Sequence, residues 1–409
     1  MPAPTERSRF RLSLLLSPSY LNQRRKQIHS FGDLFLRIKN IFVYSHQLIR
    51  ARTGEWREAA VQAVRKPLGA RRDKILDREL RQSRVRFASR PRAAGGYLPN
   101  PPSPVERNPL CRYELSWNTH VSCNFDCSYC WFHGHWEEFA PLNRYVPAAD
   151  WKRHWARFNA KHGPAKIDIA GGEPFTYPQF LEILEDLGRK NVVVVSTNLS
   201  WGVERFIAHV DPDHVEISAS FHPEFAGAPE AFLEKITRLR KAGFHANVSL
   251  VAYPAFLPRL LEFVDLFLSR GILLDVQPFR GMWEGRLYPQ SYTADSKALL
   301  EKIIDGAHRG EYYPGLPPER KIHRVEATSL VLEYQLGRKS TRGVACNAGV
   351  FYGRLQPHGD VTRCSQGAYV GNFFDENFGF WPQAEPCPFK QCDCVNEIIY
   401  IEGGPLGPQ

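Results

Sequence analysis

The sequence has no apolar run approaching the roughly 18 residues that a membrane-spanning helix needs. The run "LSLLLS" near the start is too short for the core of a signal peptide, and the basic stretch "NQRRKQ" follows it where a cleavage site would lie. We therefore expect a cytoplasmic protein whose thiols stay reduced. In that compartment nine cysteines favour a metal site or catalysis over disulfides.

Acidic residues are scarce at the front of the chain. Residues 1–100 hold 22 Lys and Arg but only 7 Asp and Glu, whereas the rest of the chain holds 31 basic and 36 acidic residues. Apolar residues at helical spacing predict an amphipathic helix within 19–66, and a second basic helix is predicted over 70–86. The stripe of the first helix is Ile28, Phe31, Phe35, Ile38 and Phe42.

A stretch rich in Pro and Gly, "SRPRAAGGYLPNPPSPVERNP", separates this basic segment from the body and is typical of a linker. We predict a basic helical extension over 1–88, a linker over 89–110, a catalytic body over 111–310 and a cysteine-rich domain over 311–409.

Strand and helix patterns alternate through the body, which predicts parallel β/α units. Six units indicate an α/β fold, a partial TIM-like (β/α)6 barrel with functional residues at the carboxyl ends of its strands. The predicted strands are 112–117, 165–170, 191–197, 214–220, 245–253 and 272–279, and the predicted helices lie around 150–161, 178–189, 203–209, 230–242, 257–269 and 296–307.

Three cysteines follow the first predicted strand in "HVSCNFDCSYC": Cys123, Cys127 and Cys130, with no fourth cysteine nearby. Structural zinc uses four ligands, usually in two separated pairs, whereas an open coordination position is typical of a catalytic metal. His120, His133 and His135 are the other nearby ligand types, and we interpret His133 and His135 as ordinary loop residues. The alternatives are a structural metal loop or three unrelated core thiols.

This C-x3-C-x2-C motif, with Tyr129 before its last cysteine, resembles the signature of the radical S-adenosylmethionine (SAM) superfamily, and the resemblance covers about residues 111–395. It implies a catalytic 4Fe–4S cluster whose fourth iron is chelated by SAM. Reductive cleavage of SAM then releases a 5′-deoxyadenosyl radical that abstracts a substrate hydrogen, chemistry that belongs to the cofactor.

The segment "DIAGGEPF" follows the second predicted strand, where glycines let the backbone approach a ligand closely. The resemblance implies that Gly171, Gly172 and Glu173 bind SAM, with Pro174 fixing the turn.

Polar residues near the ends of later strands are further SAM-binding candidates by the same resemblance, and the alternative is that they simply meet solvent. They are Ser196, Asn198, Ser218, Ser220 and Asn247. For substrate contact or proton transfer we predict His222, Asp275, Gln277 and Arg280.

Five cysteines near the end of the chain resemble the SPASM and twitch extensions of the superfamily, which bind auxiliary 4Fe–4S clusters. They are Cys346, Cys364, Cys387, Cys392 and Cys394, and the first two bracket a predicted hairpin. One auxiliary cluster is implied, the spacing does not tell which four cysteines bind it, and structural zinc is the alternative. Cys111 is predicted to be a small buried hydrophobe.

The resulting hypothesis is a radical SAM oxidoreductase that oxidises or rearranges a small polar or sugar-like molecule, served by a flavodoxin- or ferredoxin-type electron donor. The alternatives are a peptide or protein side-chain maturase and a non-enzymatic metal-stabilised binding protein. For the basic segment, packing on the barrel competes with peripheral contact to an anionic membrane. Nucleic acid is disfavoured because the segment carries no recognisable binding motif.

Overall fold

The structure is a computed structural model that describes residues 100–104, 111–227, 229–272, 274–308, 333–334, 338–390, 392 and 400–402. The two predicted basic helices, most of the predicted linker and Cys394 lie outside these residues. In the described part, no helix combines the length and apolar character needed to cross a membrane.

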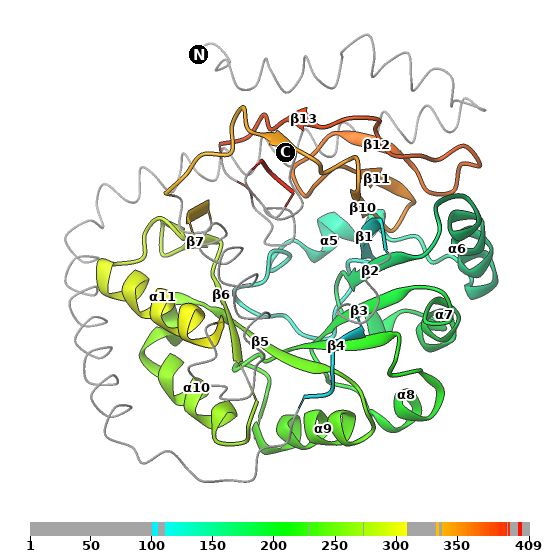
Figure 1. The fold of residues 1–409 in the computed structure, drawn as a ribbon. Helices are drawn as coiled ribbons and strands as arrows, with labels where there is room; N and C mark the ends of the chain where they lie inside the picture. Colours follow the sequence, from blue (N-terminus) through cyan, green and yellow to red (C-terminus); the bar gives the residue numbers. More distant parts are fainter. Residues whose placement is uncertain are drawn as a thin grey trace. The chain divides into compact units, whose positions relative to one another are not determined.

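Six parallel strands form the body, and each pairs with the next one along the chain, as the alternation predicts. The sheet curves, with most of the helices on its outer side and α5 (Trp136–Phe139) inside the curve (Figure 1). The strands are β1 (Tyr113–Asn118), β2 (Ala165–Ala170), β3 (Val192–Thr197), β4 (Val215–Ser220), β5 (Ala246–Ala252) and β6 (Leu274–Pro278). The helices are α5 (Trp136–Phe139), α6 (Ala148–His162), α7 (Phe180–Leu187), α8 (Glu204–His209), α9 (Pro229–Lys241), α10 (Leu260–Leu268) and α11 (Ala294–His308).

Alternate residues of these strands divide between an apolar and a polar face, because successive side chains of a strand point in opposite directions. One set joins the main core with the helices, including the fully buried Trp117, Ile167 and Val195. The other set is mostly polar and forms rows across neighbouring strands. The register aligns Ser196, Ser218 and Asn247 in one row, and Ser220, Ser249 and Asp275 in the next.

The sheet does not end at β1. Strand β10 (Tyr352–Leu355) pairs in parallel with β1, and β11 (Asp360–Thr362) and β12 (Tyr369–Asn372) follow by antiparallel pairing, which gives a nine-stranded sheet. The predicted hairpin is confirmed as β10 and β11, with Gly359 at φ 91° in its turn. The sheet thus continues past residue 310, where the sequence predicted a domain boundary.

Two short antiparallel ladders complete the described strands. Strand β7 (Gly281–Trp283) pairs with β8 (Arg286–Tyr288) just after β6. Strand β9 (Ala345–Cys346) pairs with β13 (Glu385–Pro386), and Cys346 also bridges to Ile401. The second ladder therefore brings two distant parts of the cysteine-rich segment together.

A buried ionic cluster joins the last described residues to the sheet. Lys166 Nζ lies 3.2 Å from Glu114 Oε1 and 3.0 Å from Asp168 Oδ2. The Tyr400 hydroxyl donates to Glu114 Oε2 at 2.6 Å. Burial raises the pKa of Glu114 to about 8, against the effect of the Lys166 charge. Losing the Tyr400–Glu114 hydrogen bond would leave a buried polar group without its partner, so this bond holds the 400–402 segment on β1.

Candidate active site

The three cysteines predicted to bind a metal lie in one loop, residues 119–135, between β1 and α5; we call it the cysteine loop. It leaves β1 at the carboxyl edge of the parallel sheet, where active sites of such folds lie. Cys127 is 5% exposed, and Cys123 and Cys130 are half-buried. All three thiols are free.

Burial sets the acidity of these thiols. It raises the pKa of Cys123 and Cys130, and it raises that of Cys127 to about 12, helped by the nearby charges of Cys130 and Glu224. Thiolates in this loop therefore need a cationic partner, which is what coordination to a metal provides.

The "GGEP" segment packs directly against the cysteine loop. Gly172 N donates to His120 O at 2.8 Å, and Glu173 N donates to Ser122 O at 3.0 Å. A Cβ on Gly172 would lie 1.7 Å from Ser122 O, and one on Gly171, whose φ is 133°, would lie 2.4 Å from His120 O. The backbone of the cysteine loop thus lies so close to both positions that only glycine fits. The sequence did not predict this contact.

The Glu173 side chain ties the end of β3 to the same region. Its carboxylate accepts hydrogen bonds from Thr197 Oγ1 at 2.7 Å, Asn198 N at 2.7 Å and Phe175 N at 3.1 Å. The residue is 1% exposed, and burial raises the pKa of its carboxyl while these donors oppose the rise. Pro174 is buried and begins the following 3-10 turn.

Asn198 connects β3 to the first cysteine. Its Nδ2 donates to Asn124 Oδ1 at 2.9 Å and lies 3.8 Å from Cys123 Sγ. Asn124 Nδ2 in turn donates to Ser200 Oγ at 2.9 Å. The end of β3 therefore fixes the start of the cysteine motif.

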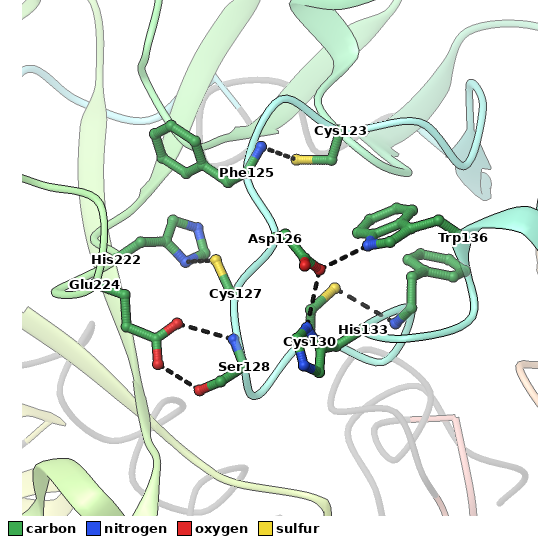
Figure 2. A network of polar contacts seen from close by, with 11 residues as sticks. Cys123, Phe125, Asp126, Cys127, Ser128, Cys130, His133, Trp136, His222 and Glu224 are labelled. Carbon is green, nitrogen blue, oxygen red and sulfur yellow. Dashed lines mark hydrogen bonds and ion pairs between the residues drawn. The ribbon is translucent and has the colours of Figure 1, made fainter.

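The segment after β4 holds the second half of the motif (Figure 2). Glu224 Oε2 accepts a hydrogen bond from Ser128 N at 2.8 Å, and Glu224 Oε1 accepts one from Ser128 Oγ. His222 Nδ1 lies 2.8 Å from the Tyr129 hydroxyl and 3.2 Å from Cys127 Sγ. Burial lowers the pKa of His222 to about 4, so its imidazole is neutral at pH 7.

The structure brings only part of the predicted site to the cysteine loop. His222 and Asn198 contact it, whereas Ser196 and Ser218 share a row along the polar face and Ser220 Oγ lies 3.4 Å from Ser249 Oγ. Asn247 lies near the start of β5, and its side chain bonds to Asn100 at 3.0 Å and to His245 at 3.0 Å.

The remaining predicted residues lie on β6 or just after it. Gln277 Nε2 donates to Asp275 Oδ2 at 2.7 Å, on the polar face of that strand. Arg280 lies just beyond its end and donates to Cys392 O at 3.2 Å. Of these residues, Arg280 connects the barrel to the cysteine-rich segment.

Four of the five C-terminal cysteines line a single pocket with about 330 Å³ of empty space, including the part open to solvent. They are Cys346, Cys364, Cys387 and Cys392. Burial raises the pKa of Cys346, and the Arg363 charge opposes that rise. Cys111, by contrast, is half-buried, so the prediction of a buried residue is only partly met.

Sequence reasoning missed Glu224 and Ser128. The available signal was an acidic residue just beyond a strand end, in "FHPEF", where functional side chains of parallel sheets gather. Nothing in the sequence indicates its partner, which lies 96 positions away.

The interaction between Ser128 and Glu224 can be measured as a coupling free energy. We expect Ser128→Ala and Glu224→Ala to show a coupling free energy of about 1 kcal/mol in a double-mutant cycle, because each single variant loses the hydrogen bond from Ser128 Oγ to Glu224, whereas the backbone donor at position 128 is kept in Ser128→Ala. Chemical denaturation of both single variants and the double variant measures it. Strict additivity of the two single effects would show that the hydrogen bond between Ser128 Oγ and Glu224 does not stabilise the loop.

Comparison with known proteins gives one family match. Residues 117–259 match the model of the Radical SAM superfamily. No curated protein sequence matches the chain.

Solved structures give further similarities. SuiB of Streptococcus suis bound to S-adenosylmethionine is similar with 16% identity and a TM-score of 0.45, covering 66% of this chain and 65% of SuiB. SuiB bound to the precursor peptide SuiA has 14% identity and a TM-score of 0.43 over the same shares, 66% and 65%. The enzyme anSMEcpe with bound AdoMet has 14% identity and a TM-score of 0.42, covering 64% of this chain and 78% of that one. The chain therefore spans about 65% of the length of SuiB.

Proposed function

We propose that this chain, whose residues 117–259 match the Radical SAM superfamily, is a radical SAM oxidoreductase. Cys123, Cys127 and Cys130 hold three irons of a 4Fe–4S cluster, and the fourth iron is left for SAM. The main support for this proposal is the backbone hydrogen bonding between "GGEP" and the cysteine loop. It brings the predicted SAM-binding segment and the predicted cluster-binding segment together at the carboxyl edge of the sheet.

The thiol arrangement fits a cluster better than a single ion. Among the residues that the structure describes, no three His, Cys, Asp or Glu side chains converge tightly enough to hold one metal ion. A 4Fe–4S cube binds each cysteine at a different iron, so its ligands surround a volume and need not meet at a point. Three thiols in one loop, all needing a cationic partner, match that requirement.

The chain's own residues position SAM and its reactive bond. Gly171, Gly172 and Glu173 lie against the loop, and Asn198 reaches Cys123, so both segments would lie close to a cluster held by this loop. Together with SAM, the reduced cluster supplies a 5′-deoxyadenosyl radical for hydrogen abstraction. Glu224, His222 and Tyr129 fix the loop between its second and third cysteines.

The polar inner face supports a small polar substrate. The rows of Ser, Asn, Asp and Gln side chains on β3 to β6 offer hydrogen-bond partners and little apolar surface. We propose that the substrate contacts Asp275 and Gln277 on β6 and Arg280 just after it. A peptide substrate is the competing outcome, and it would appear as peptide-dependent, not sugar-dependent, loss of SAM.

The C-terminal pocket supports a second iron–sulfur centre. Four thiols line it, which is the number that full ligation of a 4Fe–4S cluster requires. We propose that this centre exchanges one electron with the substrate radical, which would make a net two-electron oxidation possible.

Anaerobic reconstitution tests the proposed function directly. With iron, sulfide, SAM and a one-electron reductant, we expect about eight irons per chain, as two 4Fe–4S clusters require, and release of 5′-deoxyadenosine. A one-electron donor of the flavodoxin or ferredoxin type should replace the chemical reductant. Stoichiometric zinc binding with intact SAM would refute the proposal and favour a metal-stabilised binding protein.

A further inference from the structure

Two arginines reach the walls of the four-cysteine pocket from different parts of the fold. Arg363 follows β11, and Arg280 follows β6. Each donates a hydrogen bond to the backbone carbonyl of a pocket-lining cysteine: Arg363 to Cys346 O at 3.4 Å, and Arg280 to Cys392 O at 3.2 Å. Arg363 therefore lines the pocket itself, and Arg280 bonds to the backbone of a residue that lines it.

Arg363 is held firmly in this position. It is only 5% exposed, and its guanidinium also donates to Glu385 O at 3.0 Å and Pro386 O at 3.4 Å. Its charged group lies 5.2 Å from the centre of the Trp381 ring, within cation–π range. Every one of these partners is neutral.

Arg280 is less fully bonded. Its Nη2 is buried and has no hydrogen-bond partner, and its Nη1 bonds only to a neutral carbonyl. A buried donor without a partner is unfavourable, and more so when the group is charged. We infer that this side chain serves an electrostatic purpose.

Neither arginine has a carboxylate counter-ion within ion-pair distance among the described residues. Burying positive charge without a counter-charge is unfavourable, so an anion is expected nearby. An iron–sulfur core bound by four cysteine thiolates carries a net negative charge. Both guanidinium groups bond to the backbone of cysteines that line the pocket proposed for such a core.

We propose that Arg363 and Arg280 compensate the charge of the iron–sulfur centre in this pocket and raise its reduction potential. The inference rests on the proposed function, because it needs the second centre. A neighbouring positive charge stabilises the reduced, more negative form, and net charge and hydrogen bonding are known to set cluster potentials. In this role the arginines transfer no proton and form or break no covalent bond.

A redox titration of the reconstituted full-length chain tests the proposal. Replacing Cys123, Cys127 and Cys130 by alanine in every variant leaves only the C-terminal centre to report. We expect Arg280→Gln and Arg363→Gln each to shift the oxidised-to-reduced ratio about tenfold toward the oxidised form, about 59 mV for one electron. Arg280→Lys keeps the charge and should recover most of that shift, and the exposed Arg189→Gln should show none.

The outcomes separate the two proposals. An unchanged potential in Arg280→Gln, with full iron content, would overturn the charge-compensation proposal and leave the second centre intact. Absence of any iron–sulfur spectrum in the parent variant would overturn both. Because Arg363 is deeply buried and its glutamine variant is at risk of misfolding, the comparison of Arg280→Gln with Arg280→Lys decides the matter.

Discussion

A chain with Cys123, Cys127 and Cys130 all replaced by alanine should release no 5′-deoxyadenosine from SAM. It should also lose the irons of one 4Fe–4S cluster and keep those of the other, which is about four irons per chain. Alanine has no metal ligand, so the open-iron cluster cannot assemble in the cysteine loop. The thiols of the C-terminal pocket remain, since they belong to separate elements. Iron analysis and the visible spectrum measure the remaining cluster, and product analysis by mass spectrometry measures the loss of cleavage.

Cys111→Ala is the matched control for this variant. Cys111 is a half-buried free cysteine outside both predicted sets, so its loss should change neither the iron content nor SAM cleavage. Cleavage that persists in the triple variant would refute the assignment of the catalytic cluster to this loop.

Gly172→Ala should destabilise the fold by at least about 3 kcal/mol and remove the catalytic cluster. The new Cβ would lie 1.7 Å from Ser122 O and 2.9 Å from Cys123 N, so the backbones of two segments must separate. That separation breaks the hydrogen bonds from Gly172 N to His120 O and from Glu173 N to Ser122 O. Denaturant unfolding and iron analysis measure the two losses.

Gly379→Ala gives the control for that substitution. A Cβ at Gly379 would have its nearest neighbours at 4.0 Å, so the change should be nearly neutral. If Gly172→Ala matched this control in both stability and iron content, the close packing of "GGEP" on the cysteine loop would be wrong.

The strands of the barrel could be predicted because their patterning is local. Apolar core residues alternate with residues of the polar face, as Ile167 and Ile169 do on β2 and Val193 and Val195 do on β3. The sequence of each strand therefore indicates which side chains face the core. The predicted strands therefore match the observed bounds within a residue or two, and the predicted β/α order matches as well.

Contacts between distant residues could not be predicted in the same way. The parallel pairing of β10 with β1 joins Tyr352 to Glu114, and no local pattern signals it. The glycines of "GGEP" were interpreted as sites where a ligand approaches the backbone, which stays a prediction, and the sequence did not reveal that the cysteine loop packs closely against them. Glu224 was missed for the same reason, since its role depends on a loop folded against it.

The cysteine-rich segment shows the same limit. Its composition predicted a shared site, but spacing alone did not tell which thiols gather. The structure places Cys346, Cys364, Cys387 and Cys392 around one pocket, although these residues come from β9, a loop after β11 and the stretch beyond β13. The SAM-binding roles of Ser196, Ser218, Ser220 and Asn247 remain predictions.

The central claim is that SAM occupies the iron that the cysteine loop leaves open. Electron–nuclear double resonance of the reduced chain, with SAM labelled by ¹⁵N at its amino group and the C-terminal pocket cysteines replaced by alanine, tests it directly. We predict a resolved ¹⁵N coupling to the remaining cluster, because the amino group would bind its iron. A cluster signal that does not change when labelled SAM is added would contradict the account.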